Sequence, residues 1–208
     1  MLKIIGKWLR NTPDVASRAS FCDFLADQAY FAAQKAVVSY CEVKAGANRD
    51  KLFAEKEFQD ALARCRWESF AAVLADLLLL AHRYLRAHAD GQERALATAL
   101  ARLYPAILDA QPRPPHRVEG WEDVAVPFAA RLEQARIDGV AAPAEVARTA
   151  ARRVLQVLPI HEEHRRHDRE AIEGAVRFHT VAAWETMVRR VDAAAVAADL
   201  LREGLRNP

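Results

Sequence analysis

The chain has 208 residues, of which 52% are hydrophobic and 28% charged, and its formal net charge is only +2. A chain of this length fits one domain and can bury a core without disulfides or metals. The near-zero net charge disfavours nucleic-acid binding, because no strong global field attracts phosphates. Abundant alanine and only 7 glycines favour helices and exclude collagen-like and disordered classes.

The cysteine pattern and the apolar runs predict a cytoplasmic protein. Cys22, Cys41 and Cys65 include no C-x-x-C pair, so we expect reduced core thiols. Basic residues interrupt the apolar N-terminal stretch, which is not the pattern of a secretory signal. The longest apolar run, residues 70–81, is interrupted by Asp76 and is shorter than the roughly 20 residues of a bilayer span.

Residues 1–11 have the pattern of a short amphipathic helix that contacts a membrane or a partner. Its apolar side consists of Leu2, Ile5, Trp8 and Leu9, and its cationic edge consists of Lys3, Lys7 and Arg10. A tryptophan beside cations suits the headgroup region of an anionic membrane surface. The alternative is that the same apolar side packs back onto the rest of the chain.

Two long helices are expected next. The sequence Thr12-Pro13-Asp14 favours a helix start and Gly46 favours a stop, which predicts a helix over about 13–45. A second long helix should begin near Asp50 or Glu57, cover about 57–88 and end before Asp90-Gly91. Its middle is apolar on nearly all sides, so we place it at the centre of the fold.

The next expected elements are separated by prolines. A helix over about 92–110 contains Pro105 and should kink or break there. The segment 111–120 has three prolines and is the clearest loop. The helix that follows, about 121–138, should be interrupted by Pro127.

Three further helices complete the expected fold. They cover about 143–158, 160–190 and a terminal stretch to about 203, which Asp192 should cap. No stretch alternates apolar and polar residues between turn signals, so no strand is expected. The sequence therefore predicts an all-α fold, with residues 12–208 as a single-domain bundle of six or seven helices.

The stretch HEEHRRHDRE, residues 161–170, is the strongest candidate site. We expect this stretch to belong to one helix over 160–190. That helix would place its arginines and glutamates in solvent and turn its apolar side, including Phe178, inward. The polar residues expected on the inward side are His161, His164, Asp168 and His179.

An imidazole and a carboxylate one helical turn apart can share a zinc or iron ion, which makes His164 and Asp168 candidate metal ligands. Asp76 or Glu42 would complete the ligand set from another helix. The plainer interpretation is a hydrogen-bonded pair that closes the core. Neither Glu-x-x-His nor His-Glu-x-x-His occurs, which weighs against di-iron and zinc-protease patterns.

His82 follows the apolar run of the second long helix, where it could bind a haem or a metal, although a satisfied core histidine is the simpler expectation. On the same helix face, Asp76 and Arg83 are expected to form either an internal pair or a polar seam between helices. In residues 144–158 we note Arg148, Arg152 and Arg153, a basic face that would suit phosphate or an acidic protein unless it is merely solvated.

No complete catalytic signature is present. None of the four serines lies in G-x-S-x-G, and no phosphate-binding glycine motif occurs. We therefore expect no cofactor and favour a non-catalytic accessory protein that acts through protein contacts near the inner face of a membrane. One alternative is a helical enzyme or metal-binding protein with an interior His/Asp pocket. A second is a lipid or isoprenoid binder with an enclosed apolar cavity along the second long helix.

Overall fold

The computed structural model describes the backbone of residues 14–206 and the side chains of residues 14–203. Within this range it contains ten α-helices, two short 3-10 helices and no strand, so the predicted all-α fold is confirmed. The helices are α1 (Arg18–Ala45), α2 (Arg49–Ala54), α3 (Lys56–Leu85), α4 (Glu93–Asp109), α5 (Glu122–Asp138), α6 (Pro143–Val146), α7 (Arg148–Val157), α8 (Glu162–Arg165), α9 (Arg169–Arg190) and α10 (Ala193–Arg206), with 3-10 turns at Gly46–Asn48 and Arg86–His88.

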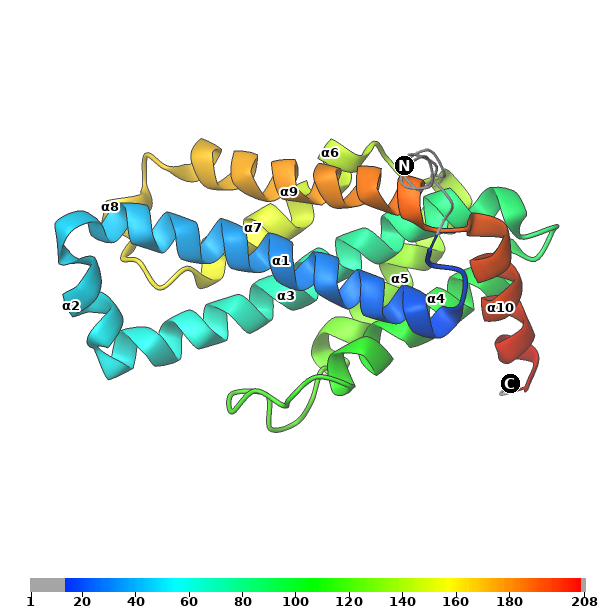
Figure 1. Ribbon diagram of the computed structural model, residues 1–208, viewed down its shortest axis with the longest axis horizontal. Helices are drawn as coiled ribbons and strands as arrows, with labels where there is room; N and C mark the ends of the chain where they lie inside the picture. The colour runs from blue at the N-terminus through cyan, green and yellow to red at the C-terminus, as the bar shows by residue number, and fades with distance from the viewer. Residues whose placement is uncertain (1–13, 207–208) are drawn as a thin grey trace, which may run out of the picture.

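Three long helices run along the molecule (Figure 1). The two long helices predicted from the sequence are α1 and α3, which lie antiparallel and pack against each other. On the opposite side of α1 lies α9, and α7 packs against both α3 and α9. At the end of the molecule near α10, helices α4 and α5 pack together beside α3.

The centre of the bundle is the middle of α3. Leu74, Leu77, Leu78 and Leu80 have no exposed surface, and each contributes about 2 kcal/mol by burial. Helices α1, α4, α7 and α9 enclose this stretch. The central position predicted for the apolar run is therefore confirmed.

Side-chain caps mark the starts of α1 and α10, and a backbone bridge holds these two starts near each other. The Ser17 hydroxyl accepts from the Ser20 N–H at 3.2 Å, so α1 begins at Arg18 rather than at residue 13. The predicted cap is confirmed at α10, where Asp192 Oδ1 accepts from the Ala195 N–H at 3.0 Å. A parallel bridge joins Val15 to Val191, which holds the start of the described chain against the turn between α9 and α10.

The two interior prolines do not interrupt their helices. Helix α4 continues through Pro105 and α5 continues through Pro127, so a break at Pro105 and the interruption at Pro127 are wrong, while a kink at Pro105 stays a prediction. Buried residues flank Pro105 on both sides, and the neighbouring Tyr104 donates its hydroxyl to the Ala71 carbonyl at 3.0 Å. This packing compensates for the one backbone hydrogen bond that a proline removes.

The stretch predicted as one helix over 160–190 is two helices. Short α8 ends at Arg165, and α9 begins at Arg169 after a three-residue turn. The predicted helix over 143–158 is also divided, because α6 ends at Val146 and α7 begins at Arg148. Because of the break before α9, the side chains of α8 no longer share a helix face with those of α9. The predicted site depended on that shared face.

Candidate functional site

His161 and His164 lie at the surface, so the prediction that they point inward is wrong. The His161 side chain is 70% exposed, and the two rings meet edge to face with centroids 6.2 Å apart. Both line an open hollow beside Lys44 and Leu52, where α1 and α2 meet. Their outward position follows from the break, because α8 does not continue the turn pattern of α9.

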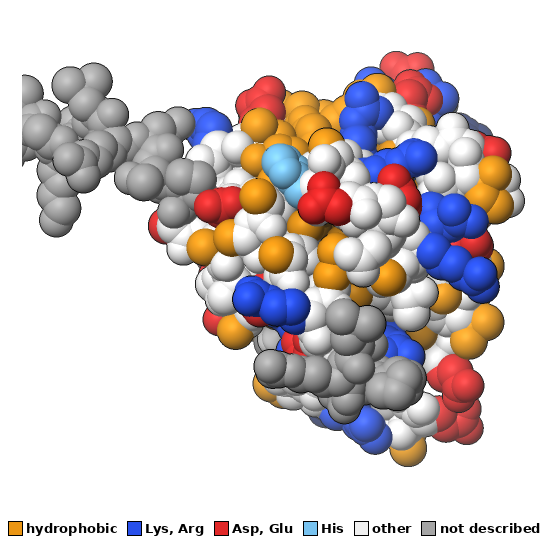
Figure 2. Space-filling model, turned by 90° about the vertical axis from the view of Figure 1, so that its right-hand side faces the viewer, with side chains coloured by type: hydrophobic (Ala, Val, Ile, Leu, Met, Phe, Trp, Pro, Cys, Tyr) orange, Lys and Arg blue, Asp and Glu red, His pale blue; other side chains and the backbone are white. Residues whose placement is uncertain are grey.

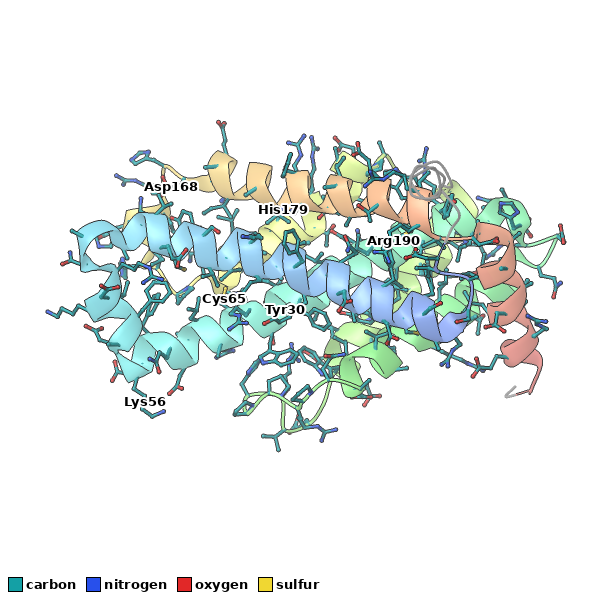
Figure 3. The ribbon with its side chains drawn as sticks, in the orientation of Figure 1. Tyr30, Lys56, Cys65, Asp168, His179 and Arg190 are labelled. Atoms are coloured by element: carbon teal, nitrogen blue, oxygen red, sulfur yellow. The ribbon has the colours of Figure 1, made fainter. Side chains whose placement is uncertain are left out.

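Asp168 bonds to α1 rather than to a histidine. Its Oδ2 accepts from the Tyr40 hydroxyl at 2.9 Å and from the Lys44 ammonium group. The hydrogen bond from Lys44, followed by that from Tyr40, holds the Asp168 pKa below its usual value. Asp168 therefore attaches the start of α9 to α1 as a carboxylate that already has two donors (Figure 3).

His179 lies between two exposed phenylalanines on the seam of α1 and α9. Its ring centroid is 5.9 Å from that of Phe31 and 5.3 Å from that of Phe178, both edge to face. Partial burial, followed by the charge of Lys35, lowers the His179 pKa. The prediction that Phe178 faces inward is wrong, because its side chain is 68% exposed.

Asp76 is completely buried in α3 and is paired. Its Oδ1 accepts from Arg131 Nη1 at 2.7 Å, and its Oδ2 accepts from the Ala150 N–H at 3.0 Å. Burial raises the Asp76 pKa to about 6, although Arg131 and the Ala150 N–H oppose the increase. The expected pair with Arg83 is wrong, because Arg83 donates to the carbonyl of Val140.

His82 is fully buried, and neither of its ring nitrogens has a hydrogen-bond partner. The expectation of a satisfied core histidine is therefore wrong. Burial, followed by the positive charge of Arg86, lowers the His82 pKa, so the ring is neutral at pH 7. An unpartnered buried imidazole lowers the stability of the folded chain.

The predicted pocket residues are thus separated in space. Within residues 14–203 no three His, Cys, Asp or Glu side chains are grouped so that they could hold a metal ion. Glu42, proposed as a further ligand, instead accepts from Arg49 Nη2 at 2.7 Å. Cys41 and Cys65 are buried free thiols, and burial raises the pKa of each to about 12.

A buried ionic cluster centred on Glu68 was not predicted. This carboxylate in α3 is 4% exposed, and Arg117 donates to it twice, from Nε and Nη2, both at 2.7 Å. Arg153 Nη2 donates to Glu68 Oε2 at 2.6 Å, and His116 Nε2 lies 2.9 Å from Oε1. The Arg117 guanidinium also stacks on Trp121 at 4.5 Å from the ring centroid.

The Glu68 cluster attaches the proline-rich loop and α7 to the centre of α3. Its sequence signal was weak, since Glu68 is a single acid beside an apolar run and its partners lie 48 to 85 residues away. Two basic features of the sequence could have indicated an anionic partner: the pair His116-Arg117 inside the 111–120 loop, and Arg153 in the basic face of residues 144–158. Every donor is directed at an internal carboxylate, so the cluster has the character of a structural anchor.

Three rings form a surface across α1 and α9, which we call the aromatic surface: the exposed Phe31 and Phe178, with the half-buried His179 between them. In Figure 3, Tyr30 and His179 lie on the two sides of α1. At the end of the molecule near α10, apolar side chains are interspersed with charged ones (Figure 2).

The basic face predicted on residues 144–158 is partly neutralised. Arg148 pairs with Glu145 at 3.0 Å and Arg153 pairs with Glu68, whereas Arg152 has no ion pair with a described carboxylate. Residues 1–11, including the predicted membrane contacts, lie outside the described residues. None of the described helices has a stretch apolar and long enough to cross a bilayer.

Comparison with protein-family models, with curated proteins and with solved structures found no match to this chain.

Proposed function

We propose that this protein is a non-catalytic helical accessory protein that binds another protein through the aromatic surface on α1 and α9. The observation that carries the proposal is the exposure of two phenylalanine rings at the seam of α1 and α9. Phe178 is 68% exposed and Phe31 53%. Adjacent exposed apolar groups mark sites of protein contact, and aromatic residues are enriched at the centres of interfaces.

The composition of the aromatic surface resembles the centre of a binding interface. Aromatic and arginine side chains contribute most of the energy at such centres because they bury a large area at little entropic cost. Phe31 and Phe178 are held in place by the ring of His179 between them. The surface is therefore ordered before a partner binds, which lowers the entropic cost of association.

The cations around the aromatic surface indicate the chemistry of the partner. Lys35 Nζ lies 5.9 Å from the Phe31 ring centroid, and on the neighbouring α3 side of α1 the Arg66 guanidinium lies 5.7 Å from the ring centroid of Tyr30. Neither cation has an ion pair with a carboxylate among the described residues, and Arg66 Nε is buried without a hydrogen-bond partner. A partner with an apolar centre and acidic edges fits this arrangement.

Site-specific photo-crosslinking in the cells of origin tests the proposal. A photoreactive phenylalanine at position 178 is expected to form one discrete adduct with another protein. Phe31→Ser should reduce that adduct about tenfold, because truncating a central ring of an interface typically costs more than 1 kcal/mol. Val43→Ser is the matched control, since Val43 is also on α1 and is 82% exposed but lies outside the aromatic surface.

The probe also needs a control position on another part of the molecule. Val118 in the proline-rich loop is 76% exposed and serves this purpose. The same adduct from position 118, an adduct insensitive to Phe31→Ser, or no adduct at all would refute the proposed surface. An adduct with the mass of two chains would show that the partner is a second copy of this protein.

The predicted cytoplasmic location and contact with the inner membrane face belong to the same proposal. They are supported by the sequence of residues 1–11, whose apolar side is edged by Lys3, Lys7 and Arg10. Each cation near an anionic leaflet contributes about 1 kcal/mol. Membrane contact would bring the aromatic surface close to partners located there.

Deleting residues 1–11 is expected to reduce cosedimentation with vesicles that contain about one third anionic lipid, at least fivefold if all three cations contribute. The loss should disappear with neutral vesicles and at high salt. If the shortened and full-length chains sediment equally, or if neither does, the membrane part of the proposal is wrong. The aromatic surface would be unaffected by that result.

A further inference from the structure

A second surface feature has a different chemistry. An open hollow of about 450 Å³ lies where α7, α8 and α9 meet, at the end of the molecule opposite α10 (Figure 1). Four arginines and a single acid line it, together with an amide and one aliphatic side chain. The lining residues are Arg152, Leu155, Gln156, Glu162, Arg165, Arg166 and Arg169.

The guanidinium groups in this hollow lack internal counterions. Among the described residues, no carboxylate forms an ion pair with Arg152, Arg165 or Arg166, and Arg169 reaches Glu173 only at 3.5 Å. Arg117 and Arg153, by contrast, are paired closely with Glu68. Unpaired like charges repel each other, so their convergence lowers stability unless an anion binds.

Two further observations identify an anion as the missing partner. Arg165 Nε is buried without a hydrogen-bond acceptor, and burial of an unsatisfied donor costs free energy that an oxyanion would recover. Arg169 is the first residue of α9, a helix of 22 residues whose N-cap Asp168 makes no side-chain cap bond. The positive end of the helix dipole is therefore also at the hollow.

We propose that the hollow binds a phosphate group, carried by a small phosphorylated compound. Guanidinium groups pair with phosphate oxygens through two parallel hydrogen bonds, which explains a preference for arginine over lysine. The volume is in the range of small-molecule sites and exceeds that of a phosphate alone, and Leu155 offers an apolar wall to the remainder of the compound. This site is separate from the aromatic surface.

Calorimetric titration with pyrophosphate at constant ionic strength tests the inference. The full chain is expected to bind one equivalent saturably, and Arg165→Gln should weaken the affinity at least tenfold. Arg177→Gln is the matched control, because Arg177 is an exposed arginine of α9 that does not line the hollow. The affinity of the control should stay within twofold, and the unfolding temperature of each variant without ligand shows whether it is folded.

A lipid headgroup could supply the same phosphate chemistry, so vesicles with phosphatidic acid form the second arm. Pyrophosphate binding that depends on Arg165 supports a soluble compound. Vesicle binding that depends on Arg165, without pyrophosphate binding, assigns the phosphate to a headgroup. The inference is overturned if neither ligand binds, or if Arg165→Gln and Arg177→Gln weaken binding equally. Loss of residues 1–11 should not change pyrophosphate affinity, which separates this test from the membrane proposal.

Discussion

Replacing Glu68 with alanine is expected to lower the free energy of unfolding by about 4 kcal/mol, because removal of one member of a buried ionic cluster leaves its partners unpaired. Arg117 would lose two hydrogen bonds of 2.7 Å and would remain only 11% exposed. For a chain of this size the unfolding temperature should fall by about 12 °C. Thermal unfolding followed by circular dichroism measures this change.

A control on the same helix separates the effect of losing a buried ion pair from the effect of losing an exposed one. Asp60 also pairs with a cation of α3, Lys56, at 3.0 Å, but both side chains are largely exposed. Asp60→Ala should therefore change the unfolding temperature by only about 1 °C. A change of similar size in both variants would mean that the Glu68 cluster is not an energetic anchor.

The acid side of the stability profile provides a second readout for Glu68. Burial raises its pKa, but the hydrogen bonds from Arg117, Arg153 and His116 outweigh burial and lower the pKa to about 2. The cluster therefore stabilises the fold fully above pH 4.5, and this contribution is lost as pH falls toward 2. In the Glu68→Gln variant, the free energy of unfolding should not show this part of the decrease in acid.

Asp76 is expected to have the opposite pH dependence. Burial raises its pKa to about 6 from 3.8, so the folded chain retains a proton on Asp76 that the unfolded chain has released between these values. The contribution of Asp76 is present below pH 4 and is lost as pH rises through 6, a decrease of about 3 kcal/mol. Denaturant unfolding of the wild-type chain and of Asp76→Asn at closely spaced pH values measures it.

The quantity to compare is the difference in stability between wild type and Asp76→Asn, because other groups titrate in both. This difference should change by about 3 kcal/mol between about pH 3 and pH 7, should be half lost near pH 5, and should be constant above pH 7. A constant difference across the whole range would show that Asp76 keeps an ordinary pKa, with Arg131 compensating fully for burial.

Two helix boundaries were predictable from a local residue, although the cap of α1 at Ser17 was missed in favour of Thr12. Gly46 ends α1 with a φ of 51°, which suits glycine, and Asp192 caps α10 through its own side chain. The buried run of α3 was also predictable, because apolar residues on all sides of a helix require contacts on all sides. These signals depend on neighbours in the sequence alone.

The prediction of the candidate pocket was wrong because the geometry of that region depends on contacts between residues that are distant in the sequence. Nothing near Arg166 or His167 marks a helix end, yet the chain turns there, and Asp168 bonds to Tyr40 and Lys44 on α1. Once α8 is separate from α9, the inward direction of His164 no longer follows from that of Ile172. The same limit applies to Glu68, whose partners belong to a loop and to α7.

The aromatic surface was missed for a related reason. Phe178 was assigned to the inward side together with Ile172, but at roughly 100° per residue it lies about 120° away from Ile172 around the helix. The side of α9 that is buried is narrower and consists of Ile172, Val176, Thr180, Ala183 and Met187. Phe31 lies on the exposed stripe of α1, where a phenylalanine contributes nothing to the core. Two exposed rings on different helices become a candidate interface only when the helices are placed side by side.

The most direct test of the account measures binding and stability in the same variants. With the crosslinked partner purified, Phe178→Ser should weaken its binding at least tenfold without lowering the unfolding temperature, since Phe178 is largely exposed. Glu68→Gln should lower the unfolding temperature and leave the affinity unchanged at 20 °C. The reverse pattern, in which Glu68→Gln weakens binding and Phe178→Ser does not, would contradict a function carried by the aromatic surface.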